Sequence, residues 1–175
     1  MRPSMVAKDE PRGNTPSLHF MGKHATFFLP TRPNFGYAPH MSRKILLVAA
    51  AALVDRDNRV LIARRPDGKS MAGLWEFPGG KVQSTETPEA ALRRELFEEL
   101  GIDVCETCLS PLTFASHAYD EFHLLMPLYL CRQWDGTIAA REGQEIAWVR
   151  AVRLTNYPMP PADEPLIAPL RDLLG

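Results

Sequence analysis

The sequence predicts a mixed domain of the α/β or α+β class, in which β-strands pack against two helices. Apolar runs and two-residue alternation, which are the patterns of strands, recur between residues 45 and 150. Residues 88–100 instead repeat their leucines every four positions, as an amphipathic helix does. The chain has 175 residues, of which 45% are hydrophobic and 23% are charged, so these elements form one ordinary domain.

The composition excludes several classes of protein. The formal net charge is −1, so no global basic field draws the chain to nucleic acid or to a membrane surface. No run of about 18 apolar residues is present, so the sequence predicts no membrane-spanning segment. Three cysteines are a small, odd number that is typical of a reduced protein. We therefore expect a cytoplasmic protein that forms no stable complex with nucleic acid or membrane.

Residues 1–43 differ from the rest of the chain. They hold six of the 16 prolines, and their six Lys and Arg against two Asp and Glu give a charge of +4. Residues 44–175 have 14 against 19, or −5. Because the prolines interrupt any periodic pattern, we expect a disordered tail ahead of a domain at 44–175. A translation start at Met41 would leave that domain intact. A targeting peptide and a basic nucleic-acid arm are the alternatives, and the dispersed charges favour neither.

The first part of the domain contains two strands and a short extended segment. Ile45–Val54 is an apolar run, which indicates a buried strand. The turn at residues 55–58 separates it from the alternating segment Arg59–Arg65, so we expect these two strands to pair as a hairpin. A Pro-Asp-Gly sequence at residues 66–68 ends the second strand. Trp75–Phe77 then forms a short extended piece that stops at Pro-Gly-Gly.

The clearest element is a helix at Pro88–Leu100. Thr87 is a favourable N-cap, proline suits the first helical position, and Gly101 suits the residue after the end. A helix at Asp163–Leu173 closes the chain, and Pro169 should bend or shorten it. Three further strands are expected at Leu109–Ala115, His123–Arg132 and Ile146–Arg150.

One face of the first helix is acidic. Glu95, Glu98 and Glu99 stand at positions i, i+3 and i+4, so their carboxylates share this face. Like charges at this spacing repel one another. A hard divalent cation removes the repulsion and prefers oxygen ligands, which makes the face a candidate Mg²⁺ site. The alternative is a solvated acidic face paired with arginines. The longer motif around the helix, described next, decides between these two interpretations.

The residues around this helix match a long motif. Residues 80–102 fit the pattern G-x5-E-x7-R-E-U-x-E-E-x-G-U, where U is apolar, at every specified position. The matching residues are Gly80, Glu86, Arg94, Glu95, Leu96, Glu98, Glu99, Gly101 and Ile102. The stretch resembles the Nudix box, and the region from Ile45 to near Leu173 resembles the MutT branch of Nudix hydrolases. The resemblance implies an α/β/α sandwich with a mixed β-sheet between helices.

The resemblance also implies an activity. MutT-like hydrolases convert oxidised purine nucleoside triphosphates, 8-oxo-dGTP above all, to the monophosphate and pyrophosphate. We therefore expect a Mg²⁺-dependent 8-oxo-dGTP diphosphatase, with Mn²⁺ as the alternative ion, that sanitises the nucleotide pool and so serves DNA repair. Its partner is a nucleoside triphosphate, and it is a monomer or a weak homodimer.

Two other functions stay open at this point. A hydrolase of dinucleoside polyphosphates or RNA 5′ ends is the alternative within the superfamily, since Tyr119 resembles a mark of dinucleotide hydrolases. A non-catalytic nucleotide-binding sensor is a remote alternative, because such modules usually lose box glutamates and this box is complete.

Site residues follow from the resemblance by position. Glu95 is the first candidate for the general base, and Arg94 is expected to orient it. The residues expected to act in catalysis are Glu95, Arg94, Glu98 and Glu142. The residues that match metal ligands are Gly79, through its carbonyl, Glu95, Glu98, Glu99 and Glu142. The residues that match nucleotide contacts are Arg65, Glu76, Phe77, Pro78, Gly79 and Asp163. Gly80 and Glu86 match positions that shape the loop before the helix.

Some positions depart from the family pattern. MutT relatives often carry Asn where Asp163 stands, and an ionised carboxylate only accepts hydrogen bonds, whereas an amide also donates. Asp163 could accept from the ring N–H and exocyclic amine of a purine, or hold a proton if buried. Phe122 replaces an arginine that reaches the nucleotide in some relatives. Gln83 and Thr85 replace the common Glu and Gly of the box loop.

Two further motifs carry less weight. Cys105 and Cys108 form a CxxC sequence, but no second CxxC or spaced histidine pair completes a zinc site, and the pair follows a helix instead of opening one. Gly68-Lys69-Ser70 resembles the end of a phosphate-binding loop, but the upstream glycine and the following helix are absent. Neither motif is expected to function.

Overall fold

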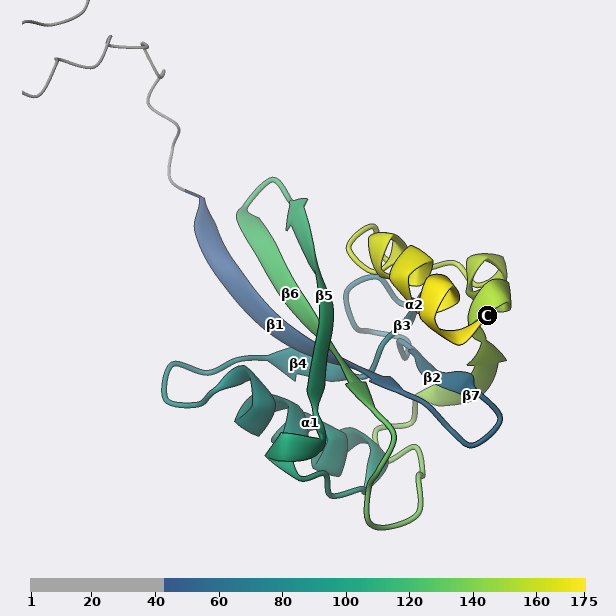
Figure 1. Cartoon of the computed structure of the whole chain (residues 1–175). Helices are drawn as coiled ribbons and strands as arrows, with labels where there is room; N and C mark the ends of the chain where they lie inside the picture. The colour runs from purple at the N-terminus through teal and green to yellow at the C-terminus, as the bar shows by residue number, and fades with distance from the viewer. Residues whose placement is uncertain (1–42) are drawn as a thin grey trace, which may run out of the picture. The chain divides into compact units, whose positions relative to one another are not determined.

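The computed structural model describes residues 43–175 (Figure 1). The predicted tail, apart from Arg43, and the start at Met41 lie outside the described residues. Among the helices that are described, none is both long and apolar enough to cross a membrane. In chain order the elements are β1 (Lys44–Leu53), β2 (Arg59–Arg64), β3 (Trp75–Glu76), β4 (Gly79–Lys81), α1 (Pro88–Leu100), η1 (Glu106–Cys108), β5 (Ser110–Ala118), β6 (Phe122–Cys131), β7 (Glu145–Arg150), η2 (Ala151–Asn156), η3 (Glu164–Leu166) and α2 (Ile167–Leu174).

Two sheets form the centre of the domain. The first has the strand order β4-β1-β6-β5, and the second has the order β3-β2-β7. β1 runs parallel to β6, from Lys44 beside Phe122 to Leu53 beside Cys131, and antiparallel to β4. The second sheet is antiparallel. The mixed first sheet and the mixed α and β content confirm the predicted fold class.

From Ala49 to Leu53, β1 belongs to the hydrophobic core on both of its faces. Ala50 and Ala52 pack in one cluster together with Leu170 of α2. Ala49 and Ala51 pack in the other, together with the leucines of α1. A strand that is covered on both faces has no polar side, which explains the continuous apolar run in its sequence. The two helices thus cover opposite faces of the mixed sheet, as the sandwich requires.

The bounds of α1 are those predicted. The side chain of Thr87 accepts a hydrogen bond from the N–H of Ala90 at 3.1 Å, and Gly101 ends the helix in the left-handed conformation with a φ of 74°. One stripe of the helix is fully buried, and each leucine in such a place contributes about 1.5–3 kcal/mol of transfer free energy. The buried residues are Ala91, Leu92, Leu96 and Leu100.

The predicted hairpin between the first two strands is wrong. β2 pairs with β3 and β7 in the second sheet, and its link to the end of β1 is an isolated bridge between Val54 and Val60. Asp55 shapes the turn, because its carboxylate accepts the N–H groups of Asp57 and Arg59 at 2.9 and 2.8 Å. Since β4 and β6 already occupy both edges of β1, β2 leaves that sheet after the turn.

The other elements differ less from expectation. β5, β6 and β7 overlap the strands predicted from the sequence. Gly79–Lys81 forms strand β4, although the Pro-Gly-Gly sequence predicts an end to extended structure there. The closing helix is divided into η3 and α2. Pro169 lies in the first turn of α2, where its missing N–H has no intrahelical partner to lose, so it does not shorten that helix.

The expectation of reduced cysteines is wrong for one pair. The short helix η1 brings Cys105 and Cys108 together, and they form a disulfide with Cα atoms 5.2 Å apart. Cys131 on β6 is free and buried. The disulfide lies in the connection between α1 and β5 and closes a short loop.

Candidate active site

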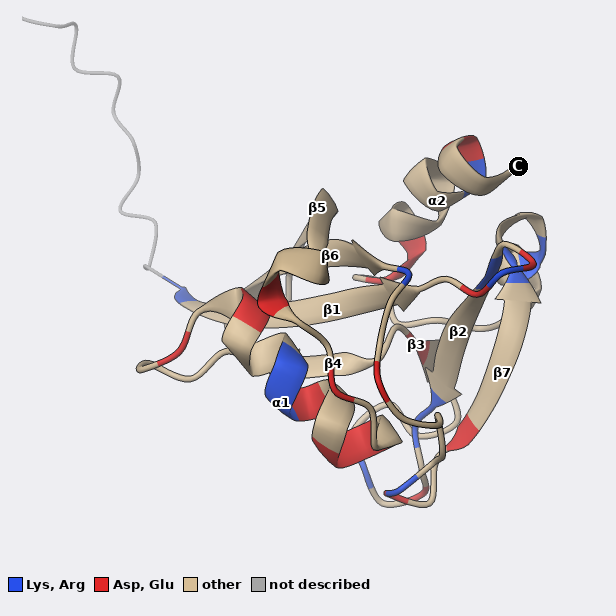
Figure 2. Ribbon diagram, turned by 60° about the horizontal axis from the view of Figure 1, so that its bottom comes forward, with Lys and Arg blue, Asp and Glu red and all other residues tan. Residues whose placement is uncertain are grey.

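Two glycines allow β4 to lie directly against β1 and α1. Gly79 has a φ of +148°, and a Cβ there would lie 2.1 Å from the backbone oxygen of Ala49. A Cβ on Gly80 would lie 2.2 Å from the Cδ atom of Glu95, whereas real Cβ contacts essentially never fall below 3.0 Å. The missing side chains therefore bring the acidic face of α1, red in Figure 2, against the β4 backbone.

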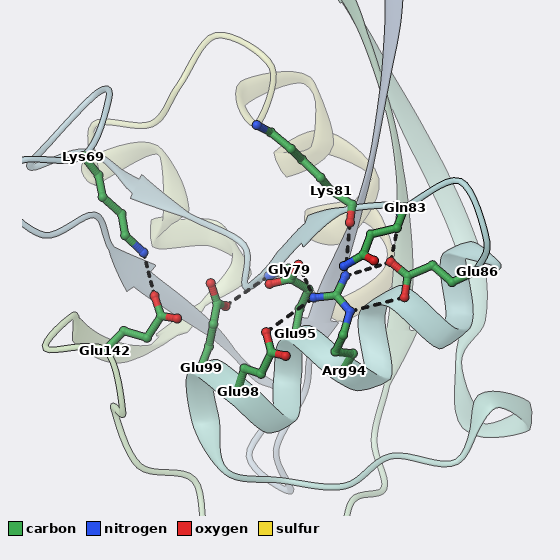
Figure 3. Close-up of polar contacts among 10 residues, drawn as sticks. All are labelled: Lys69, Gly79, Lys81, Gln83, Glu86, Arg94, Glu95, Glu98, Glu99 and Glu142. Carbon is green, nitrogen blue, oxygen red and sulfur yellow. Dashed lines mark hydrogen bonds and ion pairs between the residues drawn. The ribbon is translucent and has the colours of Figure 1, made fainter.

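Arg94 connects the loop before α1 to this acidic face. Its guanidinium donates hydrogen bonds to Glu86 and to Glu95, each at 2.8 Å, and to Glu98 at 3.4 Å. It also donates to the backbone oxygen of Lys81 at 3.2 Å (Figure 3). The hydrogen bond from Arg94 lowers the pKa of Glu86, so this carboxylate stays ionised as a loop anchor. One side chain thereby fixes the loop, the strand and two carboxylates of the helix.

Glu99 occupies a less solvated place on the same face. Its Oε2 atom accepts the backbone N–H of Gly79 at 3.3 Å. Burial, together with the charges of Glu76, Glu95 and Glu142, raises the pKa of Glu99 to about 8. A carboxyl group with this pKa is mostly protonated at neutral pH. A bound cation would reverse the shift, because an opposite charge favours the ionised form.

Glu142 reaches this region from the loop between β6 and β7. Its carboxylate accepts a hydrogen bond from the Nζ atom of Lys69 at 2.6 Å. Gln144 fastens the loop to α1, because its amide donates to the backbone oxygen of Glu99 and accepts the N–H of Glu142, each at 2.8 Å. Sequence reasoning missed Gln144. Its place two residues after a candidate ligand is the signal that could have identified it.

The acidic groups are donors of the kind that a hard divalent cation prefers. Within residues 43–175, no three acidic, imidazole or thiol groups converge closely enough to enclose a metal ion as they stand. Instead, Arg94 and Lys69 pair with carboxylates on either side of Glu99 (Figure 3). The half-buried carboxyl of Glu99 beside these pairs fits a cation, which would favour its ionised form and compete for the neighbouring carboxylates.

A cavity of about 530 Å³ lies beside the acidic face. Its size is that of a small-molecule site. The sequence-predicted site residues that line it are Arg65, Glu76, Phe77, Gly79, Gly80, Glu95, Glu99 and Asp163. Those outside its lining are Pro78, Glu86, Arg94, Glu98 and Glu142. The carbonyl of Pro78 accepts the N–H of Ala51 at 2.9 Å, so this residue anchors the chain to β1.

Asp163 and Phe77 are joined in the wall of the cavity. The N–H of Phe77 donates to Oδ1 of Asp163 at 3.2 Å, and Asp163 is only 5% exposed. Burial, together with the nearby charge of Glu76, raises the pKa of Asp163 to about 7. Asp163 therefore holds or releases a proton near neutral pH. Beside it, Arg65 forms an ion pair with Glu76 and donates to the backbone oxygen of Ser70 at 2.6 Å.

The rest of the cavity wall is apolar and aromatic. At the tip of β5 and β6, the ring centroid of Tyr119 lies 4.6 Å from the ring centroid of His117 and 4.9 Å from that of Phe122. Sequence reasoning did not assign the aliphatic part of the wall, although the two-residue spacing of its members along β1 and along β6 could have grouped them. The aliphatic wall consists of Leu46, Val48, Ala50, Leu124 and Met126. Such a surface suits a flat, partly apolar ring.

Comparison with known proteins identifies relatives. Residues 49–169 match the family model described as NUDIX domain. The chain is 42% identical over 103 residues to an 8-oxo-dGTP diphosphatase from Proteus vulgaris, across 59% of this chain and 90% of that protein. It is 39% identical over 124 residues to a CTP pyrophosphohydrolase from Escherichia coli K12, across 70% of this chain and 89% of that protein. A solved structure from a study of MutT of Aliivibrio salmonicida and Vibrio cholerae matches with a TM-score of 0.63 at 35% identity, across 74% of this chain and 99% of that chain.

Proposed function

Since the chain belongs to the NUDIX domain family and is a hydrolase of phosphoric anhydrides, we propose that it removes oxidised purine nucleoside triphosphates from the nucleotide pool. The favoured substrate is 8-oxo-dGTP, because the Proteus vulgaris relative is an 8-oxo-dGTP diphosphatase. One observation carries the proposal: a single cavity is lined both by the acidic face, through Glu95 and Glu99, and by the polar wall residue Asp163. A triphosphate and its base can therefore bind in one continuous space.

The family is divalent-metal dependent, and we propose Mg²⁺ as the physiological ion, with Mn²⁺ as a substitute. The proposed ligands are Glu95, Glu98, Glu99, Glu142 and the carbonyl of Gly79. When bound, the cation supplies positive charge against the triphosphate and polarises the phosphoryl group under attack. Support comes from the donor set, which is all oxygen, and from the raised pKa of Glu99, which the cation would lower.

The protein's own groups position the reaction. We propose Glu95 as the general base that takes a proton from the attacking water. Arg94 holds that carboxylate at 2.8 Å and so fixes its direction. Water forms a bond to one phosphorus of the α–β anhydride while the bond from that phosphorus to the bridging oxygen breaks, which yields the nucleoside monophosphate and pyrophosphate. Glu98 and Glu142 complete the acidic surroundings of the phosphates.

In the other part of the cavity, we propose that Asp163 recognises the base through hydrogen bonds. Its Oδ1 atom is occupied by the N–H of Phe77, which leaves Oδ2 for the ligand. An ionised Oδ2 accepts from the ring N–H or exocyclic amine of a purine, and a protonated one donates. Phe77, Pro78 and the ion pair of Arg65 with Glu76 shape the neighbouring wall.

A second substrate class has specific support. The Escherichia coli relative is a CTP pyrophosphohydrolase, and it matches 70% of this chain at 39% identity. A carboxylate at Asp163 can also accept the exocyclic amine of cytosine. Cytidine triphosphates are therefore the second candidate.

The test is hydrolysis with Mg²⁺ of 8-oxo-dGTP, dGTP, CTP and diadenosine tetraphosphate, followed by chromatography of the nucleotide products and compared by kcat/KM. We expect 8-oxo-dGTP to exceed dGTP at least about 100-fold, which corresponds to about 2.7 kcal/mol. A preference for CTP or for the dinucleotide would replace the proposed substrate. Glu98→Gln should abolish turnover, whereas a sensor without turnover would keep its ligand response.

The remaining proposals concern the whole protein. We propose that residues 44–175 form the Nudix hydrolase domain, that the enzyme is a monomer or weak homodimer, and that it works in the cytoplasm without a stable nucleic-acid complex. A chain starting at Met41 should retain the full kcat/KM. Sedimentation of the full chain and cell fractionation test the other two statements.

A further inference from the structure

Lys69 is a basic residue of the cavity that none of the roles above uses. It stands in the loop between β2 and β3, and it lines the cavity together with Glu99. In the sequence, the Gly-Lys-Ser motif around it carries little weight because no helix follows. The structure nevertheless brings its side chain beside the acidic face of α1 (Figure 3).

The loop that carries Lys69 is closed by hydrogen bonds. The N–H of Arg65 donates to the oxygen of Leu74 at 2.9 Å, and the N–H of Gly73 donates to the oxygen of Arg65 at 3.0 Å. Across the loop, the Nε atom of Arg65 donates to the oxygen of Ser70, next to Lys69, at 2.6 Å. The backbone of Lys69 therefore has a defined position, from which its long side chain can reach more than one partner.

The partner of Lys69 is Glu142, at 2.6 Å. The two side chains are 51% and 40% exposed. Ion pairs with this exposure contribute little free energy, because water competes for both charges. A divalent cation attracts a carboxylate more strongly than an exposed ammonium group does, since it carries twice the charge. When such a cation takes Glu142, Lys69 loses its partner at a modest cost.

A triphosphate carries more negative charge than one divalent cation neutralises. The arginines near the acidic face already have partners, since Arg94 is bonded to Glu86 and Glu95, and Arg65 pairs with Glu76. The ammonium group of a lysine is a compact charge that suits a phosphate oxygen. When Glu142 no longer pairs with it, the ammonium group of Lys69 can therefore bind an oxygen of the phosphates.

We propose that Lys69 is a phosphate-binding residue that changes partner during the reaction cycle. In the free enzyme it pairs with Glu142, and once a divalent cation binds Glu142 it turns to an oxygen of the triphosphate. The inference rests on the proposed function, because it requires Glu142 as a cation ligand and a phosphate chain in the cavity.

The test compares variants of the full chain. Lys69→Met removes the charge and keeps most of the apolar stem, Lys69→Arg keeps a positive charge, and Lys44→Met at the exposed start of β1 is the matched control. Binding of inorganic tripolyphosphate in the presence of Mg²⁺ is measured by calorimetry, because this probe has no base. Binding of Mg²⁺ alone and kcat/KM for the best nucleoside triphosphate are measured alongside.

We expect Lys69→Met to weaken tripolyphosphate binding about 10- to 100-fold and to lower kcat/KM by a similar factor, as loss of a charged hydrogen bond does. It should bind Mg²⁺ alone about threefold more tightly, because Glu142 is no longer paired. Lys69→Arg should recover most of the tripolyphosphate affinity. Lys44→Met should match the wild type in all three measurements.

Two results would overturn the proposal. One is wild-type tripolyphosphate binding by Lys69→Met. The other is a Lys69→Arg variant as weak as Lys69→Met with both melting temperatures lowered, which would assign Lys69 to loop structure. A wild-type enzyme that hydrolyses a nucleotide other than 8-oxo-dGTP would contradict the proposed substrate alone, since the tripolyphosphate comparison does not depend on the base.

Discussion

The buried carboxyl group of Asp163 should make the stability of the protein depend on pH. Its pKa is about 7, against an ordinary value of 3.8. Between these values the folded protein keeps a proton that the unfolded chain releases, so the folded state is favoured at low pH and loses this advantage as the pH rises to 7. At about 1.36 kcal/mol per pKa unit, the free energy of unfolding should fall by at most about 4 kcal/mol over this range.

Asp163→Asn removes this dependence. The amide oxygen still accepts the N–H of Phe77, and an amide has no charge to bury. The variant should therefore have a flatter profile of unfolding free energy between pH 4 and 7, and it should be more stable than the wild type at pH 8.

The assay is urea denaturation of both proteins at intervals from pH 4 to 8.5, with a constant salt concentration. Asp172→Asn, at an exposed position near the end of α2, is the control and should keep the wild-type slope. Parallel profiles for wild type and Asp163→Asn would refute the reasoning, since they would show that Asp163 titrates alike in the folded and unfolded chains.

Three further predictions concern the helix and its neighbours. Gly80→Ala should lower kcat at least about 100-fold while the protein stays folded, because the new Cβ would lie 2.2 Å from Cδ of Glu95 and displace that carboxylate; steady-state kinetics and a melting curve check this. Leu96→Ala should cost about 2–5 kcal/mol of unfolding free energy in urea titrations, because the side chain is fully buried; a smaller loss would mean that the core collapses around the gap. Chelation with EDTA should abolish activity, and re-addition of Mg²⁺ at pH 7 should release about one proton, because the pKa of Glu99 is about 8 without a cation. Calorimetry in buffers of different ionisation enthalpy counts that proton, and a count of zero would contradict the assignment.

Local signals explain why the helix could be predicted from the sequence. Thr87, Pro88 and Gly101 define its ends through contacts within one turn, and the buried leucines repeat at its own period. The acidic face follows from the same geometry. The strand order does not, because pairing depends on which edges of β1 are already occupied by β4 and β6, and both partners are remote in the sequence.

The candidate site divides in a similar way. The motif identified the carboxylates of α1 and Gly80, which faces Glu95, since the spacing of one continuous segment specifies both. It could not identify Gln144 or Lys69, whose importance comes from contacts across 45 and 73 residues of chain. It also could not show that burial changes the proton affinity of Asp163, because burial depends on the packing of elements far from that residue.

The small sheet β3-β2-β7 has a consequence for how activity appears during folding. Arg64 at the end of β2 lies opposite Glu145 at the start of β7, so this pairing sets the separation of the two loops that carry Lys69 and Glu142. A refolding chain could complete α1 and the larger sheet and still be unable to assemble the rim of its catalytic cavity. Recovery of turnover after dilution from denaturant should therefore lag behind recovery of the helical circular dichroism signal, and the interval would report the docking of β2 onto β7.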